Sequence, residues 1–158
     1  MNMTDNRIIG RELAFKFLFK IEVSSPAYLV EKNKNSELLT KDLVNFYVSI
    51  SEPDPEHPGN KVNSSTKLIA ERIILGVIEH RIEIEKSIQQ SMTKWNIEKI
   101  NKTELAILKV ACFELKYLPE NPINVVINEA INMAKKFGDQ KSSAFINGVL
   151  DHIAKNNV

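Results

Sequence analysis

The chain has 158 residues, of which 43% are hydrophobic and 26% charged, and its formal net charge is +1. These values are ordinary for a folded globular protein, and they exclude an overall basic charge as the basis of nucleic-acid binding. The single cysteine, Cys112, excludes an intrachain disulfide, and no apolar run approaches the roughly 18 residues of a membrane span, so we expect a cytoplasmic protein without a membrane segment.

Residues 7–23 have the pattern of a helix that is apolar on most sides. Glu12, Lys16 and Lys20 recur every four residues and form one polar stripe, while nearly all the other side chains are apolar. A helix of this kind is either buried in a bundle or offers a face to a partner. We expect most of these side chains in the core; Phe15 and Phe19 share a face beside the polar stripe and are therefore better partner candidates than Leu13 or Phe17.

A second helix is predicted at about 37–51, followed by SEPDPEHPGN (51–60), a loop dense in proline, glycine and acid. We take this loop as the internal boundary and expect helical subdomains at about 1–62 and 63–158. A single long helix is predicted over 65–91, with Leu68 and Ile82 among its apolar positions. Gly76 inside it costs helix stability, so we expect another helix to approach closely there.

The C-terminal part shows sharp helix boundaries. Asn101 is a good N-cap and Glu104 can complete a capping box, while Pro119 ends the helix near residue 117. A further helix is predicted over 123–137 with Gly138 as its C-cap, and Asp139 can cap a last helix through about 154. Since no strand pattern competes, we predict an all-α fold of two small packed helical bundles.

No catalytic or metal-binding motif is visible. The three histidines, His57, His80 and His152, are far apart in the sequence and have no cysteine or aspartate partner at metal-ligand spacing. Glycine-rich phosphate loops and nucleophile motifs are also absent. We therefore expect a protein that is not an enzyme and needs no cofactor or metal.

Residues 125–154, VVINEAINMAKKFGDQKSSAFINGVLDHIA, resemble the signature of the NusB family of transcription antitermination factors. The matching stretches are Ile127-Asn128-Glu129-Ala130, Ala134-Lys135, Phe137-Gly138 and Phe145-Ile146-Asn147-Gly148-Val149-Leu150-Asp151. Weaker matches occur upstream, at Glu104-Leu105-Ala106-Ile107-Leu108, Phe113-Glu114-Leu115, Arg11-Glu12-Leu13-Ala14 and Leu18-Phe19. The resemblance covers nearly the whole chain and is strongest over 100–154.

The resemblance implies an all-helical protein that binds single-stranded boxA-type RNA of ribosomal and other transcripts. It further implies a ribosomal-protein partner, NusE, and a larger antitermination complex on RNA polymerase. Phe19 and Glu104 match positions that face the ribosomal-protein partner in this family. The apolar excess of the first helix agrees with Phe19 being shared with a partner.

The same resemblance implies an RNA site, because Arg7 and Arg11 match basic positions of the family's N-terminal arm and Phe145 matches its aromatic residue near the RNA. Lys141, in the turn before the last helix, adds local positive charge, and Phe145 is equally compatible with a place in the core. Arginine and lysine would neutralise phosphates, and the phenyl ring would stack on a base. We expect the basic first helix and the start of the last helix to meet in space and form one cradle. Ile8 and Ile9 replace further arginines of the family, and Ser91 stands near a position often aromatic in relatives; both departures predict weaker or more partner-dependent RNA binding.

Other readings of the sequence stay open. The polar signature residues Asn128, Glu129, Asn147 and Asp151 are interpreted as structural groups that cap or bridge helices, and Gly148 as a point of close helix packing. A similar helical domain precedes the catalytic domain of some ribosomal-RNA methyltransferases, which makes an RNA-binding enzyme module one alternative. A homo-oligomeric helical protein without RNA binding is another, and a homodimer is compatible with either RNA-binding reading.

Overall fold

The computed structural model describes residues 3–24, 36–51 and 62–157, and in this part of the chain every regular element is helical. The predicted all-α fold is confirmed. The elements are α1 (Met3–Ser24), α2 (Ser36–Ser51), α3 (Ser64–Glu79), α4 (Arg81–Gln90), the short 3-10 helix η3 (Ile97–Lys99), α5 (Lys102–Tyr117), α6 (Ile123–Phe137) and α7 (Ser142–Asn157). The predicted loop 51–60, with His57, lies outside the described residues apart from Ser51 at the end of α2.

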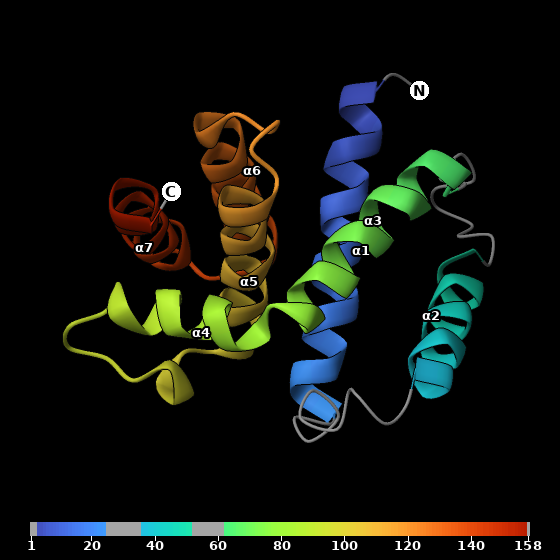
Figure 1. The fold of residues 1–158 in the computed structure, drawn as a ribbon, viewed down its shortest axis with the longest axis horizontal. Coiled ribbons are helices and arrows are strands. Elements are labelled where there is room, and N and C mark those ends of the chain that lie inside the picture. The colour runs from blue at the N-terminus through green and yellow to red at the C-terminus, as the bar shows by residue number, and fades with distance from the viewer. Residues whose placement is uncertain (1–2, 25–35, 52–61, 158) are drawn as a thin grey trace.

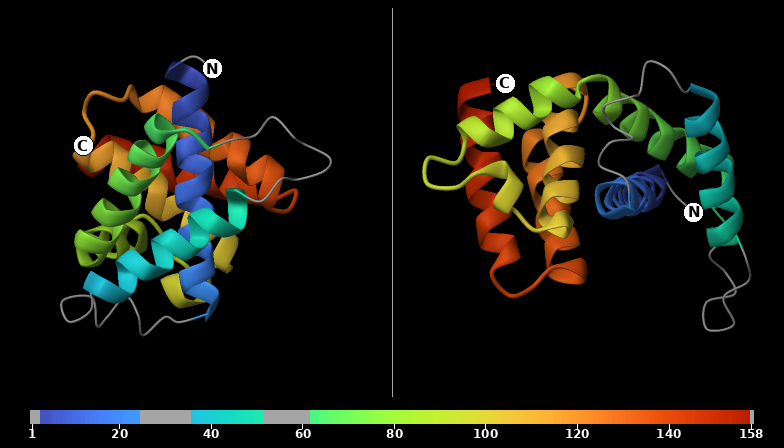
Figure 2. Two further views of the ribbon diagram at one scale, coloured as in Figure 1. Left: turned by 90° about the vertical axis from the view of Figure 1, so that its right-hand side faces the viewer. Right: turned by 90° about the horizontal axis from the view of Figure 1, so that it is seen from below.

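Helix α5 occupies the centre of the fold. It packs against α1 and α3 on one side and against α4, α6 and α7 on the other, while α3 crosses α1 and α2 lies at the outer side of that pair (Figures 1 and 2). Eleven consecutive residues of α5, Leu105 to Leu115, are buried. Because α1 packs against both α3 and α5, the division into subdomains at about 1–62 and 63–158 stays a prediction.

Local capping explains where the C-terminal helices begin. The side chain of Asn101 accepts a hydrogen bond from the backbone N–H of Glu104 at 2.8 Å, as expected for an N-cap. The Glu104 carboxylate does not complete the predicted capping box, because it accepts a hydrogen bond from the Ser142 hydroxyl at 2.8 Å. This contact ties the first turn of α5 to the first turn of α7.

The predicted single helix over 65–91 is wrong, because the helix is broken at His80 between α3 and α4. The His80 ring stacks on Tyr117 of α5, with ring centroids 3.9 Å apart. The break lets α3 pack on α1 while α4 turns to pack on α5 and α7. Leu68 and Ile82, two apolar positions of the predicted helix, are 70% and 72% exposed.

Gly76 and Gly148, two of the glycines inside helices, have different surroundings. A Cβ atom at Gly76 would lie 2.1 Å from Cζ of Phe113, so the expected close approach of another helix is confirmed. Gly148 is exposed, and a Cβ atom there would meet nothing within 4 Å. The expectation that Gly148 serves close packing is therefore wrong.

The predicted bridging role of the polar signature residues is not seen in the described part of the chain. Asn128, Asn147 and Asp151 are all exposed. The Asp151 carboxylate pairs with Lys155 one turn further along α7, at 2.8 Å, and so makes no link to a second helix. These side chains therefore face solvent on the outer surface of the last two helices.

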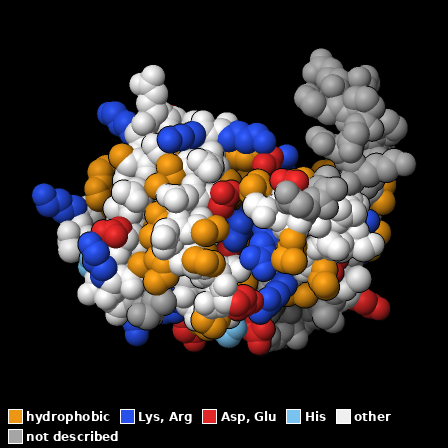
Figure 3. All heavy atoms as spheres, turned by 90° about the horizontal axis from the view of Figure 1, so that it is seen from above, with side chains coloured by type: hydrophobic (Ala, Val, Ile, Leu, Met, Phe, Trp, Pro, Cys, Tyr) orange, Lys and Arg blue, Asp and Glu red, His pale blue; other side chains and the backbone are white. Residues whose placement is uncertain are grey.

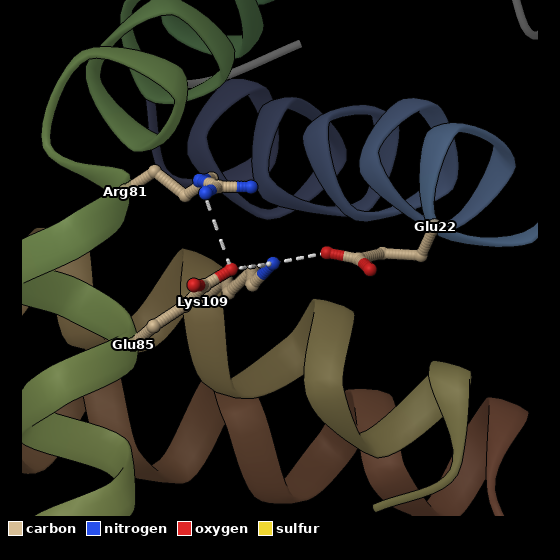
Figure 4. Close-up of polar contacts among 4 residues, drawn as sticks. All are labelled: Glu22, Arg81, Glu85 and Lys109. Carbon is tan, nitrogen blue, oxygen red and sulfur yellow. Dashed lines mark hydrogen bonds and ion pairs between the residues drawn. The ribbon is translucent and has the colours of Figure 1, made fainter. Parts of the chain in front are cut away.

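A buried ionic network joins α1, α4 and α5 (Figure 4). The Lys109 ammonium of α5, 1% exposed, contacts the Glu22 carboxylate of α1, and its Nζ lies 3.0 Å from Oε1 of Glu85 on α4. Arg81 lies 3.9 Å from the same Glu85 oxygen. Lys109 is thus one of the buried cations that hold the first helix against α4 and α5.

None of the helices in the described ranges is both long and apolar enough to cross a membrane.

Candidate RNA-binding and partner-binding surface

Arg11 lies inside the molecule, in an ion pair between α1 and α5. Its Nε lies 2.7 and 3.0 Å from the two carboxylate oxygens of Glu114, and the Asn121 amide donates to the same carboxylate at 2.9 Å. Arg11 is 4% exposed and Glu114 is 1% exposed. The guanidinium charge is therefore neutralised within the chain, and Arg11 fixes the position of α1 on α5 and on the turn that follows it.

Arg7 lies one helical turn before Arg11 and is exposed. It is close to the α5–α6 turn, where the pKa of the Glu120 carboxyl is lowered by a backbone hydrogen bond, by Arg72 and by Arg7. Arg72 also forms an ion pair with Glu120 at 2.7 Å. Two arginines share this one carboxylate, so a positive charge remains at this end of the molecule, where Figure 3 shows basic side chains gathered beside acidic and hydrophobic ones.

Lys141 lies in the α6–α7 turn, which is built by Asp139. The Asp139 carboxylate accepts hydrogen bonds from the backbone N–H groups of Lys141, at 2.8 Å, and Ser142, at 3.1 Å. These bonds, the first above all, lower the pKa of Asp139. The expected cap of the last helix is confirmed, and it leaves the Lys141 side chain exposed beside the first turn of α7.

Phe145 follows one turn later on α7. It is half-buried and packs against the hydrophobic core, and its backbone N–H donates to the carbonyl of Lys141 at 3.2 Å. The ring is thus anchored on one side and reaches the surface on the other. Such a ring can stack on a base without losing its place in the core.

An aromatic and basic cluster, of which only the α1 aromatic residues were predicted to face a partner, lies between α1 and the C-terminal end of α6. The Phe137 ring packs on Phe15, which in turn contacts Phe19, with centroids 4.9 and 6.1 Å apart. The ammonium groups of Lys16 and Lys136 lie 5.7 and 5.3 Å from the Phe137 centroid. The cluster comprises Phe15, Lys16, Phe19, Lys136 and Phe137, and we call it the α1–α6 seam.

The α1–α6 seam as a whole escaped the sequence analysis because its members from α1 and those from α6 are about 120 residues apart in the sequence. A further contact closes the seam, since Lys136 forms an ion pair with Glu12 at 2.8 Å. Phe15 is buried, whereas Phe19 is half-buried, which makes Phe19 the ring of the two with area left for a partner.

The sequence-predicted site residues therefore fall into two places. Arg7 and Arg11 lie by the α5–α6 turn, at the beginning of α6, whereas Lys141 and Phe145 follow its end. The α1–α6 seam lies between the two places, because Glu12, the residue after Arg11, pairs with Lys136 near the end of α6. That the first helix and the start of the last helix form one RNA cradle stays a prediction.

Phe19 and Glu104, the predicted partner residues, lie on the same side of this arrangement as Lys141. Phe19 connects through Phe15 to Phe137, at the end of α6. Glu104 is half-buried and holds Ser142, the residue after Lys141. A partner protein at Phe19 and Glu104 would therefore border an RNA bound at the α6–α7 turn.

The described part of the chain contains no group of three or more histidine, cysteine, aspartate or glutamate side chains placed to hold a metal ion. Cys112 is buried in α5, and burial raises the pKa of its thiol to about 12.

Comparison with known proteins identifies the family. Residues 9–155 match the model of the NusB family, and the chain belongs to this family. The transcription antitermination protein NusB of Geotalea uraniireducens (strain Rf4) is 37% identical over 145 residues, covering 92% of this chain and 91% of the relative. That of Thermodesulfovibrio yellowstonii is 35% identical over 149 residues, covering 94% and 91%.

Solved structures agree on the fold. The structure of T. maritima NusB superposes with a TM-score of 0.72 at 29% identity, covering 95% of this chain and 91% of the other. A crystal structure of the antitermination factors NusB and NusE in complex with double-stranded RNA matches with a TM-score of 0.70 at 21% identity, covering 97% and 98%. Membership of this family places the chain among transcription antitermination proteins and not among enzymes.

Proposed function

We propose that this chain is an RNA-binding antitermination factor of the cytoplasm, which binds single-stranded boxA-type RNA together with the ribosomal protein NusE. The pair would act within an antitermination complex on RNA polymerase during transcription of ribosomal RNA. The observation that carries this proposal is membership of the NusB family over residues 9–155. The relatives that the chain matches over 91% of their length are antitermination proteins, which favours this function over an RNA-methyltransferase module.

In this proposal, the exposed residues contact the RNA and the buried arginine positions the helix that carries one of them. Arg7 and Lys141 are exposed cations at the two ends of α6, and Phe145 offers a ring edge next to Lys141. An extended single strand that follows α6 would meet both cations in turn. Arg11 would act indirectly, because its ion pair with Glu114 holds the helix that carries Arg7.

The experiment is a binding titration of boxA-type RNA at several salt concentrations, with and without NusE. Arg7→Ala and Lys141→Ala should each lower the log–log salt slope by about 0.7, the value for one lost single-strand phosphate contact. Lys41→Ala, at an exposed position of α2, is the matched control and should leave the slope unchanged. Arg11→Ala should lower protein stability and leave the salt slope of the folded protein near its original value.

The NusE surface has a separate readout. Phe19→Ala should weaken NusE association by about 2 kcal/mol, or roughly thirtyfold, if the ring is a central anchor. The RNA affinity of the free protein should not change. Equal salt slopes for the Arg7 and Lys141 variants and the unmodified protein would refute the RNA site, and unchanged NusE binding of the Phe19 variant would refute the partner site.

A further inference from the structure

The segment between α4 and α5 exposes the only tryptophan of the chain. Trp95 is 62% exposed, whereas Met92 and Ile100, which flank it in the same segment, are each 7% exposed. The segment is thus anchored by other side chains, and the indole ring contributes little to packing. A large aromatic ring left in water is a common mark of a contact surface.

The backbone around Trp95 is held in one shape. The Gln89 side chain on α4 donates to the Trp95 carbonyl at 3.0 Å and accepts from the backbone N–H of Ile97 at 2.8 Å. The Asn96 side chain caps η3 by accepting from the N–H of Glu98 at 3.1 Å. A ring presented on a pre-ordered loop binds without the entropy cost of ordering that loop.

The same segment carries an excess of positive charge. Lys94, Lys99 and Lys102 are exposed, and Glu98 is the one acidic residue between positions 91 and 102, so the segment has a net charge of +2 (three lysines less one glutamate). Among the described residues, none of these three lysines has a carboxylate partner. Several other exposed lysines are paired: Lys16, Lys136 and Lys155.

We propose that Trp95, with Lys94, Lys99 and Lys102, is a second contact site for single-stranded RNA. The indole would stack on an unpaired base while the ammonium groups neutralise the neighbouring phosphates. Free positive charge beside an exposed ring suits a polyanion better than a protein surface. The inference rests on the proposed RNA-binding function and extends it to a segment that had no assigned role.

The position of this segment is consistent with one continuous RNA path. It leaves the end of α4 on the side of the C-terminal helices that faces away from α1 and α2 (Figures 1 and 2). It then leads into α5 at Lys102, two residues before Glu104, whose carboxylate holds Ser142 next to Lys141. An RNA bound at the α6–α7 turn therefore has the basic segment as its neighbour.

The test uses the full chain and Trp95 fluorescence, which no other tryptophan obscures. Titration with a single-stranded boxA-type RNA, extended at either end in separate experiments, should quench the emission to saturation. Trp95→Ala should bind the extended RNA roughly 5- to 150-fold more weakly, while Trp95→Phe keeps a ring and should retain most of the affinity. Lys94→Ala and Lys99→Ala should each lower the salt slope by about 0.7, with Lys41→Ala as control.

The outcomes separate this inference from the proposed function. If the Arg7 and Lys141 variants weaken RNA binding while Trp95 emission and the affinity of Trp95→Ala stay unchanged, the second site is refuted and the first stands. If the chain binds no RNA, both fail. If Trp95→Ala weakens only the association with NusE, the segment is a protein contact and the inference is overturned.

Discussion

The ionic network around Lys109 allows a quantitative test of what holds the two ends of the fold together. Lys109→Met removes the ammonium group but keeps most of the aliphatic volume in α5. Glu22 is 5% exposed, so its carboxylate would be left buried without its cation. Breaking a buried pair by removing one partner typically costs about 3 to 5 kcal/mol, because one charge remains uncompensated.

That loss is a large part of the stability of a domain of this size, which is typically about 5 to 15 kcal/mol. Urea unfolding followed by circular dichroism measures it directly. In a chain of 158 residues, a loss of about 3 to 5 kcal/mol in Lys109→Met should also lower the melting temperature by roughly 6 to 20 °C. Glu85→Ala serves as a comparison, because Glu85 is partly exposed and its loss leaves Glu22 beside Lys109, so we expect a cost of about 1 kcal/mol or less.

The double variant decides whether the uncompensated charge is the cause. Lys109→Met combined with Glu22→Met removes both charges and leaves apolar side chains between α1 and α5. Replacement of a whole buried pair by apolar residues is often neutral or stabilising, so the double variant should be more stable than Lys109→Met alone. If it is less stable by the sum of the two single losses, the cost comes from lost packing and the electrostatic explanation is wrong.

Further predictions concern the glycines and the cysteine. Gly76→Ala should destabilise the protein by about 1 to 3 kcal/mol, because its Cβ would clash with the Phe113 ring. Gly148→Ala should stabilise the protein by about 1 kcal/mol, because its Cβ would meet open space and alanine favours the helix. Urea unfolding measures both changes in the free energy of unfolding, and changes of the same sign would contradict the explanation. The pKa of the buried Cys112 thiol is raised to about 12, so as pH rises the unfolded chain loses the thiol proton before the folded protein does. The contribution of the protonated thiol to the free energy of unfolding is therefore complete below the pKa of the unfolded chain, and it is lost as pH rises toward 12. Between pH 9 and 11, stability should therefore fall by up to about 1.4 kcal/mol per pH unit more than in Cys112→Ala, and parallel pH profiles for the two proteins would count against this assignment.

Helix positions followed from the sequence where the signals are local. Asn101 as N-cap and Pro119 as terminator fix α5, and Gly138 ends α6, since each acts on its own backbone within a few residues. The break at His80 was missed because the apolar repeat from Leu68 to Ile82 continues across it. At the break, His80 stacks on Tyr117, 37 residues away, a contact that no local pattern records.

For the binding surface too, the sequence did not reveal contacts between residues that are far apart in the chain. The sequence analysis grouped Arg7, Arg11, Lys141 and Phe145 as one site, because family positions and local charge do not show the contacts of each side chain. The partner of Arg11 is Glu114, 103 residues away, and only the packing of α1 on α5 brings them together. A basic residue in a motif can thus stabilise the fold, and the exposure of its side chain decides whether it can also contact a ligand.

Exposure and pairing together therefore separate the cations of this chain into two groups. Arg11 and Lys109 are buried with carboxylates from other helices, and they hold α1 in place. Arg7 and Lys141 extend into solvent from the helix ends that those buried pairs position. The near-neutral net charge is compatible with RNA binding because phosphate contacts depend on local charge, and Arg7 and Lys141 place exposed positive groups at the two ends of α6.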